Sequence, residues 1–101
     1  MIVYNITIKI DPQIEKDWIE WQKNENIPEI MATGLFSEYK FYRLLEQDDT
    51  EGITYVMQYF TSSLENYKRY TEEYALKMQK KTFEKWKHQF IAFRTIMKIV
   101  N

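Results

Sequence analysis

The first ten residues, MIVYNITIKI (residues 1–10), alternate between apolar and more polar side chains with a period of two. This is the period of an extended strand with one buried face. Its more apolar side consists of Ile2, Tyr4, Ile6, Ile8 and Ile10. Its other side consists of Val3, Asn5, Thr7 and Lys9. We therefore expect a first strand that packs only one face against helices.

A helix is expected next, because Asp-Pro at residues 11–12 supplies an N-cap and a proline suited to the first helical turn. Ile14, Trp18 and Trp21 then recur at helical spacing. We expect this helix to end at Glu-Asn, residues 25–26. A short second helix over residues 28–33 follows, ended by Gly34 in the left-handed conformation.

The middle of the chain predicts an antiparallel hairpin. LFSEYKFYRLLEQ (residues 35–47) and ITYVMQYF (residues 53–60) have strand composition, and DDTEG (residues 48–52) is a turn between them. Ser62 and Glu65 have the spacing of a capping box. They begin a helix that we expect to reach about residue 81, with a further turn before it ends.

A fourth strand begins at Gln89, in QFIAFRTIMKIV (residues 89–100). The order β-α-β-β-α-β indicates an α+β, ferredoxin-like fold: a four-stranded antiparallel sheet with both helices on one face. We expect one domain over residues 1–101.

Strand alternation predicts which residues the uncovered, open face of the sheet carries. We expect it to carry Val3, Asn5, Thr7, Glu38, Lys40, Tyr42, Thr54, Val56, Gln58, Phe60, Phe90, Ala92, Arg94 and Ile96. The helix-covered face is expected to carry Tyr4, Ile6, Ile8, Ile53, Tyr55, Met57, Tyr59, Ile91, Phe93 and Met97. Apolar side chains mixed with Asn5, Gln58 and Arg94 suit a face closed against a second copy, so we expect a homodimer through the open sheet face, with polar cross-contacts or a small wet cavity at the interface.

Composition excludes several classes of protein. A net charge of −1 gives no field to attract nucleic acid or an anionic membrane, and the absence of cysteine excludes disulfides and thiolate chemistry. No apolar run approaches the roughly 20 residues of a membrane span, and the start does not resemble a signal peptide. We expect a cytoplasmic protein with no nucleic-acid or membrane partner.

Five segments in this order, MIVYNITI, WIEW, NIPEIMATGLF, ITYVMQYF and FIAFRT, resemble the DUF4286 family of small bacterial proteins of unknown function. The resemblance covers nearly the whole chain. It implies a dimeric α+β barrel, a superfamily that includes cofactor-free monooxygenases, haem-degrading enzymes, isomerases and non-catalytic ligand binders. Where such relatives often carry histidines, this chain has Asn26 and Tyr74.

Candidate binding residues follow from these patterns. Arg94 is expected either to form a cross-dimer salt bridge or to clamp a carboxylate or other anion. Trp18 and Trp21 form either a core stripe or a pocket wall, and Asn26 is either a local cap or a hydrogen-bonding group of a pocket. The expected ligand-binding set is Asn5, Trp18, Trp21, Asn26, Gln58, Tyr74 and Arg94.

Catalytic and metal-binding patterns are weak. His88 is the only histidine, so it cannot form a multi-histidine metal site, and the acidic turn at residues 46–51 lacks calcium-loop spacing. We expect no catalytic residue, no metal and no cofactor. The favoured hypothesis is a homodimer that binds a small anionic or aromatic molecule without catalysis. Alternatives are a structural or protein-interaction dimer and a cofactor-independent monooxygenase- or isomerase-like enzyme.

Overall fold

The computed structural model describes residues 1–101, as four strands and a layer of helices. The strands are β1 (Ile2–Ile10), β2 (Glu38–Arg43), β3 (Ile53–Thr61) and β4 (Phe90–Lys98). The helices are a 3₁₀ turn (Pro12–Ile14), α1 (Glu15–Trp21), a π-helical turn (Gln22–Asn26), α2 (Ile27–Met31), α3 (Leu64–Glu73) and α4 (Ala75–Trp86). None of these helices is long and apolar enough to cross a membrane.

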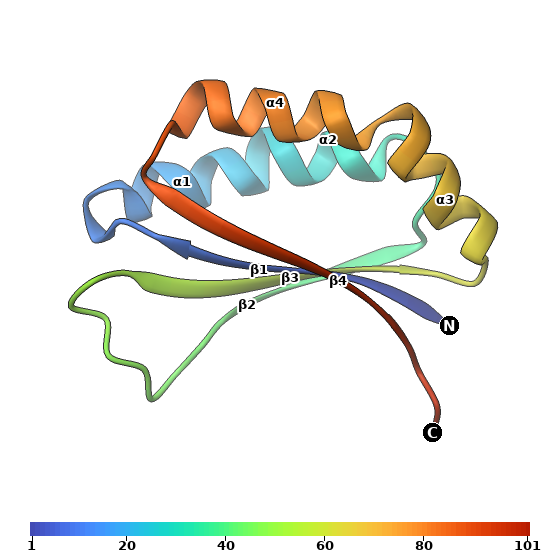
Figure 1. The fold of residues 1–101 in the computed structure, drawn as a ribbon, viewed down its shortest axis with the longest axis horizontal. Coiled ribbons are helices and arrows are strands. Elements are labelled where there is room, and N and C mark those ends of the chain that lie inside the picture. Colours follow the sequence, from blue (N-terminus) through green and yellow to red (C-terminus); the bar gives the residue numbers. More distant parts are fainter.

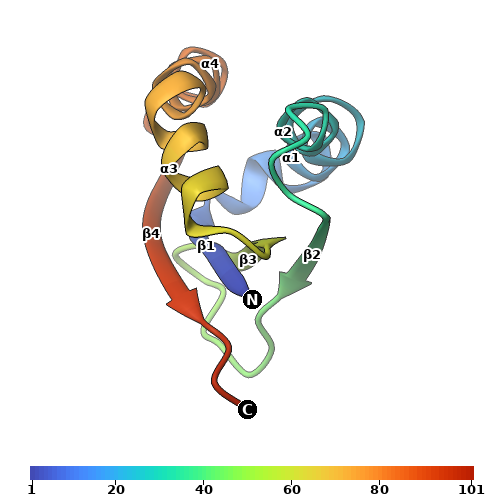
Figure 2. The ribbon, with the colours of Figure 1, turned by 90° about the vertical axis from the view of Figure 1, so that its right-hand side faces the viewer.

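All strand pairs are antiparallel, in the order β2-β3-β1-β4, so the expected α+β sheet is confirmed. The helices lie together on one face, and the opposite face is uncovered (Figure 1). The β2–β3 connection and the C-terminus extend beyond the sheet on that uncovered side (Figure 2).

The first helical segment does not end at residues 25–26 as expected. Its backbone continues through the π-helical turn, in which the Ile27 N–H donates to the Gln22 carbonyl. Pro28 then occupies one of the first two positions of α2. The five-residue spacing of that hydrogen bond shifts the ladder by one residue. Pro28 lacks an N–H, and this shift allows the helical backbone to continue through it.

The second helical segment also differs in two details. Ser63, not Ser62, is the N-cap, and its hydroxyl accepts a hydrogen bond from the Asn66 N–H at 3.2 Å. Tyr74, at φ −128°, interrupts the segment between α3 and α4, and the helix then runs on to Trp86.

The expected faces of β1, β2 and β3 are confirmed, but that of β4 is wrong. Arg94 lies opposite Ile6, and Phe93 lies opposite Thr7. Because directly paired residues share a face, Arg94 points to the helix-covered side and Phe93 to the open side. The residues that change face with Phe93 are Ile91 and Met97, and those that change face with Arg94 are Phe90, Ala92 and Ile96. The register with β1 sets this phase, since apolar residues occur on both sides of β4.

A core of large side chains fills the space between the helix layer and the sheet. Trp18, Met57 and Tyr59 are almost fully buried there. Aromatic rings make much of this core, as in the edge-to-face pair of Trp18 and Phe41, whose centroids lie 5.8 Å apart. Helix and sheet positions are thereby fixed relative to each other.

Gly34 has φ +76°, which confirms the expected left-handed residue after the helix. A Cβ added there would meet nothing within 4 Å. We therefore expect Gly34→Ala to lower the free energy of unfolding by about 1 kcal/mol, through backbone strain alone. Gly34→Asn should lose less, since asparagine tolerates this conformation better. Chemical denaturation followed by tryptophan fluorescence measures both, and an unchanged midpoint for the alanine variant would contradict the assignment.

Candidate functional site

A small cavity lies between the helix layer and the sheet, on the face that carries Arg94. Its volume is about 30 Å³, which is room for about two water molecules. β1, β3, β4, the helices α2, α3 and α4 and the π-helical turn all contribute to its lining. The polar side chains among its 13 lining residues are Tyr4, Gln22, Asn26, Tyr70, Gln79, Thr82 and Arg94.

The π-helical turn presents two amide side chains to this cavity. Asn26 Nδ2 donates a hydrogen bond to Gln22 Oε1 at 2.8 Å. Gln22 is fully buried, and its Nε2 has no hydrogen-bond partner. The fold thus leaves an unused donor in a buried position, where an unmet hydrogen bond is unfavourable.

Arg94 supplies the charge at this site. It lies on the edge strand β4 and is exposed, so it marks the side of the cavity nearest to solvent. No aspartate, glutamate, lysine or histidine lines the cavity. The arginine is therefore the one ionised group there at neutral pH.

Two buried phenols lie close to this arginine. Burial raises the pKa of Tyr4, and the Arg94 charge and hydrogen bond oppose that rise. Burial also raises the pKa of Tyr70, reinforced by Tyr4 and again opposed by Arg94. Both phenols consequently stay protonated near neutral pH, so they add hydroxyl groups that donate or accept hydrogen bonds but carry no negative charge.

The structure separates most of the residues expected to bind a ligand. Of the seven, only Asn26 and Arg94 line this cavity. Asn5 and Gln58 lie on the open face, where Gln58 Nε2 donates to Asn5 Oδ1 at 3.2 Å. From the sequence, Arg94 was expected on the open face beside these two residues. Arg94 instead points to the helix-covered face, so it is not their neighbour.

The aromatic candidates serve the packing of the helices. Trp18 packs against Tyr55 at a centroid distance of 5.1 Å, and Trp21 packs edge-to-face against Trp86 at 5.8 Å. Tyr74 stacks on Tyr70 and lines a separate surface depression. None of these three candidates lines the Arg94 cavity.

Sequence reasoning did not select Gln22, Tyr4 or Tyr70 as site residues. Gln22 lies four residues before Asn26, which is helical spacing, and this was the signal that could have linked the two amides. Tyr4 was placed on the helix-covered face of the sheet, and Tyr70 was interpreted either as a helix-packing residue or as a phenol pointing into a cavity. Both tyrosines pack in the core and line this cavity.

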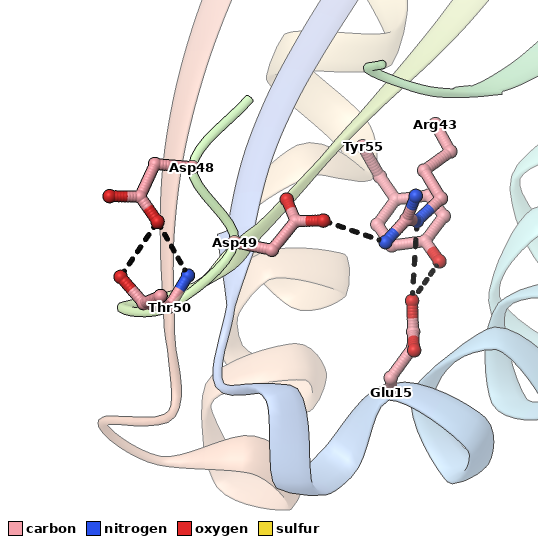
Figure 3. Close-up of polar contacts among 6 residues, drawn as sticks. All are labelled: Glu15, Arg43, Asp48, Asp49, Thr50 and Tyr55. Atoms are coloured by element: carbon pink, nitrogen blue, oxygen red, sulfur yellow. Dashed lines mark hydrogen bonds and ion pairs between the residues drawn. The ribbon is translucent and has the colours of Figure 1, made fainter. Parts of the chain in front are cut away.

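A second polar cluster joins the β2–β3 connection to α1 (Figure 3). The Tyr55 hydroxyl donates to Glu15 Oε2 at 2.6 Å, and Arg43 Nε lies 3.5 Å from the same oxygen. Arg43 Nη2 also donates to Asp49 Oδ2 at 3.0 Å. Arg43 contacts both carboxylates of the cluster, so the cluster holds the β2–β3 connection and the sheet to α1. No group of three or more acidic or histidine side chains is placed to hold a metal ion.

The family described as a domain of unknown function, DUF4286, matches residues 1–100. The chain belongs to the DUF4286 family. No curated protein matches it. The resemblance inferred from the five ordered segments is thereby confirmed.

Solved structures resemble the DUF4286 chain over 99% of its length. An ethyl tert-butyl ether d (ethd) family protein from Bacillus halodurans matches with TM-score 0.69, 13% identity and 100% of its own chain covered. A dimeric ferredoxin-like protein from an uncultured marine organism matches with TM-score 0.66, 12% identity and 96% covered. A hydroxynitrile lyase from Passiflora edulis matches with TM-score 0.64, 17% identity and 96% covered. At these identities the likeness shows a shared fold.

The Tyr55 hydroxyl makes the stability of this DUF4286 protein vary with pH in the alkaline range. Burial and the hydrogen bond to Glu15 raise its pKa from 10.0 to about 12. The folded chain therefore keeps a proton that the unfolded chain loses. The stabilisation from this group is fully present below pH 10 and is lost as the pH rises from 10 through 12.

We expect Tyr55→Phe to make that fall in stability shallower and to lower the free energy of unfolding at pH 7 by about 1–2 kcal/mol, through the lost hydrogen bond. Denaturant unfolding at pH 7 to 12 measures both effects. Tyr42→Phe is the control, because Tyr42 is exposed on the open face. Equal slopes for wild type and Tyr55→Phe would show that the Tyr55 pKa is not raised.

Proposed function

We propose that this protein is a homodimer whose protomers each bind a small anionic molecule at the Arg94 cavity, without catalysis. The observation that carries the proposal is the charge of the lining. Arg94 is its one ionised side chain, and it lies beside uncharged donors from Gln22 and the two phenols. A guanidinium with neutral donors favours a carboxylate or another oxyanion. The aromatic lining also accommodates a ligand with an apolar part.

The absence of a group that transfers protons near neutral pH supports binding over chemistry. No carboxylate or histidine lines the cavity, and the pKa of both phenols is raised by burial. His88 lies elsewhere, packed edge-to-face against Phe83 at the end of α4. The hydroxynitrile lyase shares this fold at 17% identity, but a shared fold does not imply a shared activity, and the cavity here has no catalytic base.

The open sheet face supports pairing of two copies. Ile91, Phe93 and Met97 on β4 point to that face, and they are 60%, 64% and 39% exposed. Apolar side chains of this size on an uncovered face are typical of an interface. The marine neighbour with the same fold is described as dimeric. A second copy packed face to face would bury the exposed side chains of both sheets.

A charge placed on this face, on the edge strand β4, tests the dimer. We expect Phe93→Lys to weaken dimerisation by at least about 30-fold, equivalent to about 2 kcal/mol, because an unpaired charge would be buried at the interface. Leu76→Lys is the matched control, since Leu76 is 81% exposed on α4, in the helix layer. Light scattering over a dilution series gives the molar mass. A monomeric wild type, or two variants that dimerise equally well, would contradict the assignment.

Arg94→Gln tests the anion site. We expect small carboxylates to raise the melting temperature of the wild type, with about 2.7 kcal/mol of stabilisation at 100 times the dissociation constant. The variant should lose this shift because its side chain carries no charge. Lys98→Gln, which removes a cation from the same strand outside the cavity, should retain it. If no anion stabilises the wild type, a dimer without a ligand becomes the better description.

A further inference from the structure

The buried side chain of Gln22 distinguishes one kind of anion from others. Its Oε1 is already occupied, because it accepts the 2.8 Å hydrogen bond from Asn26 Nδ2. Its Nε2 is buried without a partner, and the residue lines the Arg94 cavity. The side chain is thus fixed at its oxygen, and two N–H bonds are left for whatever occupies the cavity.

We propose that the ligand is a small carboxylate, and that Gln22 is the residue that recognises its carboxylate group. Gln22 Nε2 donates to one carboxylate oxygen from the inner side, and the Arg94 guanidinium binds the group from the solvent side. This proposal rests on the anion site proposed above, and it adds the chemical class of the ligand and a residue that determines specificity.

The volume of the cavity favours a carboxylate over larger oxyanions. The free space of about 30 Å³ equals about two water molecules, which is close to the size of a carboxylate head group. A sulfate or phosphate has four oxygens and carries up to two charges, whereas the cavity offers a single cation. The rest of the ligand extends past Arg94, so a short aliphatic acid fits without movement of the helices.

The unpaired donor is available to a ligand in the cavity. Buried side-chain polar groups in proteins are nearly always hydrogen-bonded, and an unpaired one is unfavourable for folding. A methionine at this position would fill a similar volume without the unpaired donor. A glutamine that is unfavourable in the empty protein but donates a hydrogen bond to a bound ligand explains why Nε2 is buried without a partner and why it lies at the cavity.

Side-chain amide signals in ¹⁵N-¹H spectra of the protein test the proposal directly. The Gln22 Nε2 pair is assigned by its disappearance in Gln22→Met. We expect sodium acetate and sodium propionate to shift this pair, and neither acetamide nor sodium chloride at equal ionic strength to do so. The Gln58 amide on the open face is the internal reference, because it lies on the other side of the sheet and should not move.

Binding by the variants completes the test. Gln22→Met should remain folded but melt somewhat lower than the wild type, because Asn26 Nδ2 loses its buried acceptor, and it should bind acetate at least 10-fold more weakly. Gln22→Glu should abolish acetate binding, because it puts a like charge beside the carboxylate. Lost acetate binding in a variant that remains folded is what a purely structural role of Gln22 would not produce.

Other outcomes overturn specific parts of the proposal. If Gln22→Met binds acetate as the wild type does while Arg94→Gln does not, Gln22 does not recognise the ligand and the anion site itself stands. If sulfate shifts the Gln22 signal at the same concentration as acetate, the carboxylate class is wrong. If no anion shifts the signal or raises the melting temperature, both proposals fail together.

Discussion

The antiparallel register between β1 and β4 decides what each face of the sheet presents. It places Arg94 opposite Ile6 on the helix-covered side and Phe93 opposite Thr7 on the open side. A slip by one residue would exchange every side chain of β4 between the two faces. The cavity would then lose its cation, and the open face would lose its largest exposed apolar groups. The proposed anion site and the apolar open face both depend on this one pairing.

Strand alternation, helical spacing, caps and the hairpin turn were sufficient to predict the element order, and alternation also gave the faces of β1, β2 and β3. Their buried sides are distinctly more apolar, so period-two alternation is informative there. β4 carries Phe90, Ala92 and Ile96 on one face and Ile91, Phe93 and Met97 on the other. Because apolar groups occur on both sides of β4, its sequence does not show which residues face the helices. Only hydrogen bonding with a neighbouring strand decides this, and that is a tertiary property.

The candidate site was less predictable than the fold, for two physical reasons. The large aromatic candidates are used by the core: Trp18 is fully buried between α1 and the sheet. The amides depend on the π-helical turn, which propensity does not predict because it arises where the hydrogen-bond ladder shifts just ahead of Pro28. Asn26 was selected as a local cap or a hydrogen-bonding group of a pocket, whereas Gln22, four residues earlier, was not selected although the turn brings both amides to the cavity.

Neighbouring residues of β4 serve different sides of a sheet that is one strand thick. Arg94 belongs to the cavity, and Phe93, one peptide bond away, belongs to the open face. Any rotation of this edge strand about its own axis moves both side chains at once, in opposite directions. A mechanical link between the two faces therefore needs no relay of packed side chains through the core. The shared backbone of β4 provides this link. β4 can move more easily than an inner strand because it is hydrogen-bonded along only one edge.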